Sequence, residues 1–228
     1  MKKLYLIPII HTSADMGSLA PTLDKKASVE LRPELWQKHK EIVAGFWDSI
    51  SRFIDSLNAN GFRVYQDGLF TDGTEGLRII REGISQGSRN YDIVGKLLGK
   101  GAVLMKTEDL SLVKQEYSHI KKMTGSKSLE EKGAAALKYK LAKGILLKQR
   151  DDFIAKRIEE SLGEGETGIL FIGAYHNIIP NLPADIKVVR VKEVDKVREY
   201  HTVLINKRRW GRYLQELSEY LVSPISAT

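Results

Sequence analysis

Five short apolar runs, separated by longer stretches with helical periodicity, constrain the fold of this chain more than any other feature of its sequence. The runs cover residues 4–10, 62–65, 101–105, 168–172 and 186–191. Apolar runs of this length are typical of strands that are buried on both faces of a parallel sheet. Because strands alternate with helices, we predict an α/β protein with a mostly parallel central sheet and helices on both faces.

The stretches between these runs carry apolar residues at helical spacing. The predicted helices cover residues 33–57, 75–84, 88–98, 110–123 and 128–162, with a basic amphipathic helix from about residue 208. Gly144 is a point at which the longest helix is expected to break. We expect residues 1–228 to form a single domain, with a helical insertion over roughly 70–100 and 110–162.

Two features qualify this prediction. Pro8 lies inside the first apolar run. Because proline has no backbone N–H, it favours a place at the edge of the sheet or at a bulge for this strand. The polar stretch from Thr12 to Arg32 predicts a long loop, and loops of that length are often lids or disordered segments.

The absence of cysteine excludes several classes of protein. Disulfide frameworks, thiol nucleophiles, zinc knuckles and iron–sulfur centres all require it, so a metal would have to be held by histidine and carboxylate ligands. The apolar run at residues 4–10 is too short for a signal sequence, and no segment reaches the length of a membrane span. We therefore expect a cytoplasmic protein with no membrane partner.

The net charge of +7 raises the question of a nucleic-acid partner. Residues 207–213 are the densest basic stretch and include two aromatic residues, as base stacking would require. However, 29 acidic residues are spread among the 36 basic ones, and such a run is more typical of the solvated face of a terminal helix. Nucleic acid is therefore the least favoured of the partners considered.

Polar residues follow four of the five apolar runs. They are His11, Asp67, Glu108 and His176. Because parallel strands share one carboxyl edge, where ligands bind in open α/β sheets, we expect these four side chains to converge in one pocket. Each also has a simpler interpretation. Asp67 precedes a glycine as in many turns, Glu108 could be a first-turn helix acid, and either histidine could merely be exposed.

Two further motifs were weighed in the same way. Residues 163–168 match G-x-G-x-x-G, but they follow a helix and enter a strand, which is the reverse of a dinucleotide-binding loop, so we interpret them as an acidic connector. Asp151 falls within the apolar stripe of the predicted long helix, with Arg150 on its flank. A buried carboxylate needs a partner, so these two residues belong either to a structural ion-pair network or to the pocket.

In their order along the chain these features resemble the superfamily that includes TraB, ChaN, the erythromycin esterases and the Tiki proteases. The resemblance is carried by residues 8–11, 65–67, 107–109, 149–151 and 173–176. Only the last helix–strand–histidine unit is close, because Pro8, Asp67 and Gln149 depart from the usual residues. Members of that superfamily range from esterases and metal-dependent proteases to haem-binding proteins, so the resemblance fixes no substrate.

These observations predict a hydrolase of ester or amide bonds that acts on a small-molecule or peptide substrate. The expected catalytic residues are His176, Glu108 and Arg150, the last stabilising an oxyanion. Either a divalent metal (Zn, Mn, Co or Fe) is held by His11, Asp67, Glu108 and His176, or a histidine acts without metal as the general base, with its tautomer fixed by a neighbouring carboxylate. Substrate contacts are expected from Asp109, Asp151, Tyr175 and Asn177. The alternatives are a non-catalytic pocket for a small ligand or haem and a basic nucleic-acid-associated protein, and a homo-oligomer remains open.

Overall fold

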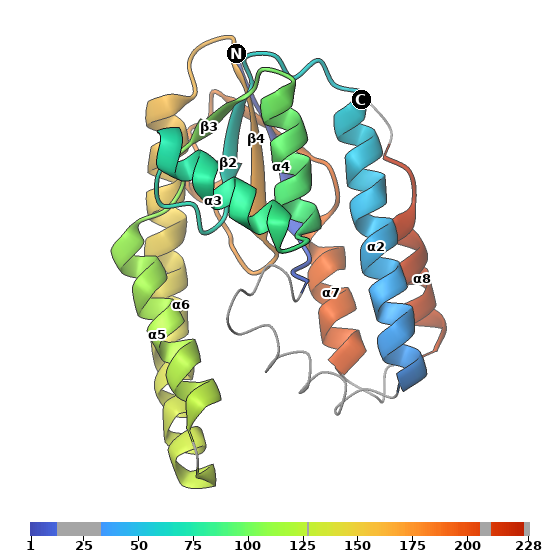
Figure 1. Ribbon diagram of the computed structural model, residues 1–228, viewed down its shortest axis with the longest axis vertical. Helices are drawn as coiled ribbons and strands as arrows, with labels where there is room; N and C mark the ends of the chain where they lie inside the picture. Colours follow the sequence, from blue (N-terminus) through green and yellow to red (C-terminus); the bar gives the residue numbers. More distant parts are fainter. Residues whose placement is uncertain (13–32, 127, 206–210, 226–228) are drawn as a thin grey trace.

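A five-stranded parallel sheet forms the centre of the protein (Figure 1). The computed structural model describes residues 1–12, 33–126, 128–205 and 211–225. The strands lie in the order β3-β2-β4-β1-β5, and every neighbouring pair is parallel. Their bounds are β1 Lys2–Ile9, β2 Arg63–Gln66, β3 Val103–Met105, β4 Thr167–Gly173 and β5 Ile186–Arg190. The predicted α/β class is therefore confirmed.

Helices connect the strands, and the described part of the chain contains those predicted from periodicity. They are α2 Pro33–Asp55, α3 Gly73–Ser85, α4 Arg89–Gly99, α5 Leu110–Gly125, α6 Leu129–Ser161, α7 Val194–Ile205 and α8 Arg212–Val222, with a short 3-10 helix, η2, at Ile179–Asn181. The capping box of Ser128 and Glu131 is present at the start of α6. Gly144 does not break that helix, since the backbone hydrogen bonds continue through it for 33 residues.

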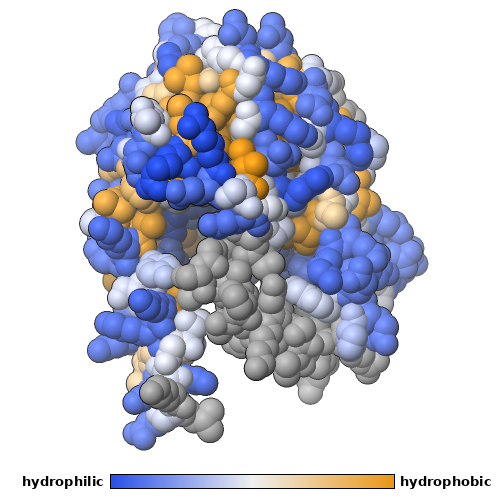
Figure 2. All heavy atoms as spheres, in the orientation of Figure 1, coloured by the Kyte–Doolittle hydropathy of each residue, from blue (hydrophilic) through white to orange (hydrophobic). Residues whose placement is uncertain are grey.

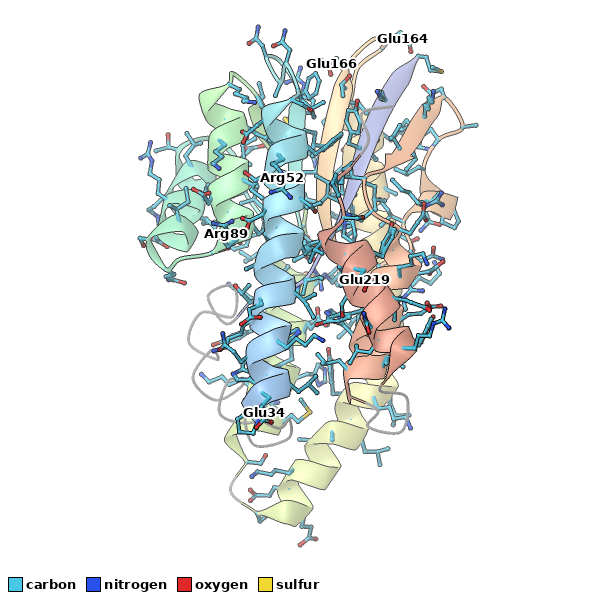
Figure 3. The ribbon with its side chains drawn as sticks, turned by 90° about the vertical axis from the view of Figure 1, so that its right-hand side faces the viewer. Glu34, Arg52, Arg89, Glu164, Glu166 and Glu219 are labelled. Atoms are coloured by element: carbon cyan, nitrogen blue, oxygen red, sulfur yellow. The ribbon has the colours of Figure 1, made fainter. Side chains whose placement is uncertain are left out.

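The alternation of side chains along the strands explains why these apolar runs are continuous. On one face, Tyr5, Ile7 and Ile9 of β1 join a core cluster with buried residues of α2, α4, α7 and α8. On the other face, Leu4 and Leu6 of the same strand pack in a second cluster with the carboxyl-terminal half of α6. Figure 3 shows α2 and α8 side by side on the outside of the first layer.

The expectation that Pro8 places β1 at an edge or a bulge is wrong. β1 lies between β4 and β5, and Pro8 is in regular register opposite Ile172. The pairing of β1 with β5, however, ends at Leu6 opposite Arg190. Pro8 therefore lies beyond the last residue that pairs with β5, where its missing N–H interrupts no pair in that ladder.

A two-helix arm extends beyond the body of the protein (Figures 1 and 3). We define the arm as residues 110–145, which comprise α5 and the amino-terminal part of α6. The remainder of α6 packs on the sheet. α3 and α4, in the range 70–100, also contribute buried residues to the first core cluster.

The predicted loop over residues 12–32 and the basic stretch at 207–210 lie almost wholly outside the described residues. Helix α8 begins at Arg212, after the expected start. Helix α7 was not predicted, although Val197, Tyr200 and Leu204 recur at helical spacing and are buried. Among the described residues, no helix combines the length and the apolar character needed to cross a bilayer.

His39 provides a test of the packing between α2 and α7. Its Nδ1 lies 2.8 Å from Tyr200 Oη, and burial lowers the pKa of His39 to about 4. The unfolded chain therefore binds this proton at a higher pH than the folded protein does. As the pH falls from about 6.5 to 4.5, the folded state should lose up to about 1.4 kcal/mol of stability per pH unit from this residue.

The measurement is urea unfolding of the wild-type protein and His39→Gln at several pH values. Glutamine can keep a hydrogen bond to Tyr200 but does not titrate. We expect the difference in unfolding free energy, wild type minus variant, to fall steadily on acidification. A difference that stays constant with pH would show that His39 is not buried in its neutral form.

Candidate functional site

The neighbouring strands β2 and β4 end close together at one edge of the sheet, which brings Asp67 beside the end of β4. The Asp67 backbone N–H donates to Phe171 O at 2.9 Å and so extends the ladder by one residue. Gly68 then turns the chain with φ at 81°, a value that glycine adopts without strain. This turn holds the Asp67 side chain at the sheet edge, where its Oδ2 accepts a hydrogen bond from Gly173 N at 2.9 Å.

Backbone hydrogen bonds attach the segment after β3 to the same edge. The backbone N–H groups of Thr107 and Glu108 both donate to Leu69 O at 2.9 Å, and the Thr107 hydroxyl accepts from Gln66 N at 2.9 Å. These bonds fix Glu108 next to Asp67, and the Glu108 side chain is fully buried.

Arg150 of α6 binds three carboxylates that come from three different elements. Its Nε lies 3.2 Å from both carboxylate oxygens of Glu108, and its Nη2 lies 2.5 Å from Glu108 Oε1 and 2.6 Å from Asp67 Oδ1. Its Nη1 donates to Glu116 on α5. The sequence left open whether Arg150 and Asp151 form an ion-pair network or belong to the pocket. In the structure, Arg150 pairs with Asp67 and Glu108 rather than with Asp151.

Asp151 instead holds His176. Its Oδ1 lies 2.5 Å from His176 Nδ1, and its Oδ2 accepts from the backbone N–H of Asn177 at 2.9 Å. An ionised carboxylate at Nδ1 requires the proton on that nitrogen, so His176 Nε2 is the nitrogen left to interact elsewhere. Nε2 lies 3.6 Å from Asp67 Oδ2.

The absence of a side chain at Gly173 leaves a small space on which three polar groups converge. A Cβ at this position would lie 3.0 Å from Asp67 Oδ2, 3.5 Å from His176 Cδ2 and 3.9 Å from His11 Nε2. Trp47 Nε1 donates to Ile10 O at 3.1 Å and so anchors the end of β1 that carries His11. His11, Asp67 and His176 therefore face one another around Gly173.

The electrostatics of the cluster follow from its burial. Burial raises the pKa of Glu108 to about 7, against the opposing effect of Arg150. Burial alone would also raise the pKa of Asp67, but the charges of His176 and Arg150 outweigh it and hold that pKa below its usual range. For His176, burial would lower the pKa, but Asp67 and Asp151 together raise it.

A cavity of about 440 Å³ opens beside this cluster. His11, Asp67, Arg150, Tyr175 and His176, all predicted site residues, line it. Glu108 does not, because Arg150 lies over it. Asp67, Glu108 and His176 nevertheless each place one possible ligand atom within 4.8 Å of the others. The structure thus contains a buried acid–histidine cluster that could form a site.

Three of the predicted substrate-binding residues lie elsewhere. Asp109 caps α5, since its Oδ1 accepts from the backbone N–H groups of Ser111 and Leu112, and it does not line the cavity. Asp151 lies behind His176, and Asn177 contributes its backbone N–H to Asp151. Both of these residues border a separate hollow instead. Asp109 is therefore better explained as a helix cap.

Sequence reasoning missed several ionisable residues that line the cavity, among them Glu116, Lys143 and His201. Glu116 of α5 binds Arg150 and accepts a hydrogen bond from Tyr139 Oη at 2.8 Å. His201 of α7 also lines the cavity, and burial lowers its pKa to about 4. None of these residues follows a strand, so the strand-end pattern could not have identified them. The rejected glycine-rich motif is indeed a connector, and Glu164 and Glu166 mark it at the other end of the sheet (Figure 3).

Comparison with known proteins gives no assignment: no protein-family model matches the sequence, and no curated protein or solved structure shows significant similarity to it.

Removal of Arg150 tests the ion-pair cluster. Arg150→Met leaves three carboxylates without their shared partner, and two of them are almost wholly buried. We expect the unfolding free energy at pH 8 to fall by about 3–5 kcal/mol. Adding Glu108→Gln should recover part of this loss, because one buried charge is then removed.

Arg212→Met is the matched control in the same urea titrations. Arg212 forms an ion pair with Glu216 but is 93% exposed, so its loss should change the unfolding free energy by less than about 1 kcal/mol. Equal effects of the two arginine substitutions would contradict the described role of Arg150.

Proposed function

We propose that the protein is a hydrolase of ester or amide bonds that uses a divalent metal at the carboxyl edge of its sheet. The observation that carries the proposal is the convergence of His11, Asp67 and His176 around Gly173, beside a cavity large enough for a small substrate. The order of motifs that resembles the TraB, ChaN, erythromycin esterase and Tiki superfamily supports the same assignment.

The residues present fit a divalent cation by charge and by donor type. Among the described residues, ion pairs join four carboxylates, those of Asp67, Glu108, Glu116 and Asp151, to Arg150 and His176. Because burial raises the pKa of Glu108 to about 7, Glu108 can carry a proton at neutral pH, and the other three carboxylates still outnumber Arg150 and His176. Imidazole and carboxylate donors together suit Zn, Mn, Co or Fe.

The geometry favours Asp67 and His176 as ligands, with His11 completing the set from the end of β1. Both oxygens of Glu108 are already hydrogen-bonded to Arg150, and Arg150 separates Glu108 from the cavity. We therefore assign Glu108 to the support of Arg150 rather than to direct coordination. Arg150 in turn acts as a positioning residue, because its donors are directed at carboxylates rather than at the place of a developing oxyanion.

Each residue of this cluster has a distinct task in the proposed reaction. When bound, a divalent cation supplies Lewis-acid chemistry, which polarises a carbonyl oxygen and acidifies water. Asp151 keeps the Nδ1 proton of His176 in place and so presents Nε2 to the cavity. Arg150 fixes the orientation of Asp67 through Oδ1 and leaves Oδ2 directed at the same space.

Calorimetric titration of the metal-free protein with Zn²⁺ or Mn²⁺ tests the proposal, together with assays on ester and amide substrates. We expect one tight site whose affinity increases with pH, because His176 must lose a proton before it can bind. His176→Ala should abolish binding and hydrolysis, and Asp151→Asn should weaken binding by about 10–100-fold. His119→Ala is the control, since His119 lies on α5 outside this cavity. Absence of tight binding and of metal-stimulated hydrolysis would refute the proposal.

Gly173→Ala tests the convergence itself. The backbone of Gly173 does not require a positive φ, so alanine fits the local conformation, but its methyl group would fill the space 3.0 Å from Asp67 Oδ2. We expect metal affinity and activity to fall while the fold persists. Gly133→Ala on α6 is the matched control, because a Cβ there meets nothing within 4 Å. Unchanged metal binding in Gly173→Ala would place the metal elsewhere.

A non-catalytic ligand pocket is the second candidate, and the tyrosines of the cavity favour it. Tyr91, Tyr117, Tyr139 and Tyr175 all line the wall, and tyrosine combines an apolar ring with a polar hydroxyl, which suits an organic ligand. Mass spectrometry and absorbance of the purified protein separate the two functions. A stoichiometric organic ligand without hydrolytic activity would favour the binding protein.

A further inference from the structure

The arm lacks a hydrophobic core of its own. Helix α5 has no buried residue among its 16 residues. Among the side chains of α6 that the structure describes, Leu146 is the first that is buried. Isolated helices gain most of their stability from packing an apolar face against another surface. The described part of the arm therefore offers apolar side chains that it does not bury itself.

These side chains form a stripe along the amino-terminal part of α6. Leu137, Leu141 and Ile145 are spaced four residues apart, which places them on one helical face, and they are 59%, 71% and 65% exposed. We refer to these three residues as the apolar stripe. They are the most exposed aliphatic side chains among the described residues apart from Met1.

The arm also carries most of the net positive charge of the protein. Residues 110–145 contain eight lysines, three glutamates and neither arginine nor aspartate, while the net charge of the whole chain is +7. Lys138 follows Leu137 and Lys140 precedes Leu141, so exposed lysines flank the stripe on both sides. In the view of Figure 2, most side chains at the free end of the arm are hydrophilic.

We propose that the apolar stripe docks the protein on an anionic lipid surface. Aliphatic side chains that enter the interface, with lysines that reach the headgroups from either side, are the features of an interfacial amphipathic helix. Each lysine near an anionic leaflet adds to the attraction. This association is peripheral and needs no membrane-spanning segment. It is independent of the proposed hydrolase function.

Other occupants fit the arm less well. A second copy of the chain would bring two arms of like charge together, which opposes their pairing. A nucleic acid would neutralise the lysines but would leave the aliphatic stripe in water, and the stripe contains no aromatic residue for base stacking. An anionic bilayer offers negative headgroups to the lysines and an apolar interior to the stripe.

Sedimentation of the full chain with vesicles tests this proposal. We expect binding to vesicles that contain phosphatidylserine, little binding to vesicles of phosphatidylcholine alone, and weaker binding as the salt concentration increases. The triple variant Leu137→Ser, Leu141→Ser, Ile145→Ser should bind more than about tenfold more weakly, because it loses the inserted aliphatic groups. Lys138→Glu with Lys140→Glu should weaken binding only to the anionic vesicles.

The control removes exposed apolar side chains elsewhere, with Ile84→Ser and Val103→Ser, which are 38% and 42% exposed. It should bind the anionic vesicles as the wild type does. Absence of binding at low salt, or equal binding by the triple variant, would overturn the proposal. A wild-type dimer in solution that becomes monomeric in the triple variant would also overturn it, as would binding to DNA or RNA but not to vesicles.

Discussion

The ion pairs of Arg150 are the interaction on which the rest of the site depends. One guanidinium from α6 holds Asp67 after β2, Glu108 after β3 and Glu116 on α5. Three like charges from separate elements would repel one another in a buried place without it. Arg150 thereby joins the sheet edge to the base of the arm. The next residue, Asp151, holds His176 after β4, so one turn of α6 organises both halves of the cluster.

The sequence predicted the architecture well because its signals are local. Continuous apolar runs, a capping box and helical spacing depend on neighbouring residues, and all five strands formed close to their expected places. Because parallel strands share one carboxyl edge, the sequence also predicted that His11, Asp67, Glu108 and His176 lie at one edge of the sheet. It could not predict which of them faces the cavity. Arg150 covers Glu108, and Arg150 lies on α6, about 40 residues away in sequence from Glu108. Glu116 and His201 were missed because they lie on helices rather than at the ends of strands.

The composition of the cluster suggests function rather than stability. Buried ion pairs often contribute less to folding stability than apolar residues of similar volume. A cluster of four carboxylates, an arginine and a histidine at the sheet edge is therefore expected to stabilise the fold less than apolar packing would. The proposed binding of a cation beside a substrate would account for their excess negative charge, the space at Gly173 and the adjacent cavity together. The apolar stripe of the arm does not line this cavity, and its proposed role concerns where the protein acts.

The most direct test of the central claim is the position of a metal in crystals of the protein soaked in Zn²⁺. The account predicts an anomalous peak about 2.0–2.2 Å from Asp67 Oδ2 and His176 Nε2, on the Gly173 side of the cluster, with Arg150 still bound to Glu108. Zinc found only at surface sites, with Asp67 and His176 arranged as described and no peak between them, would contradict it.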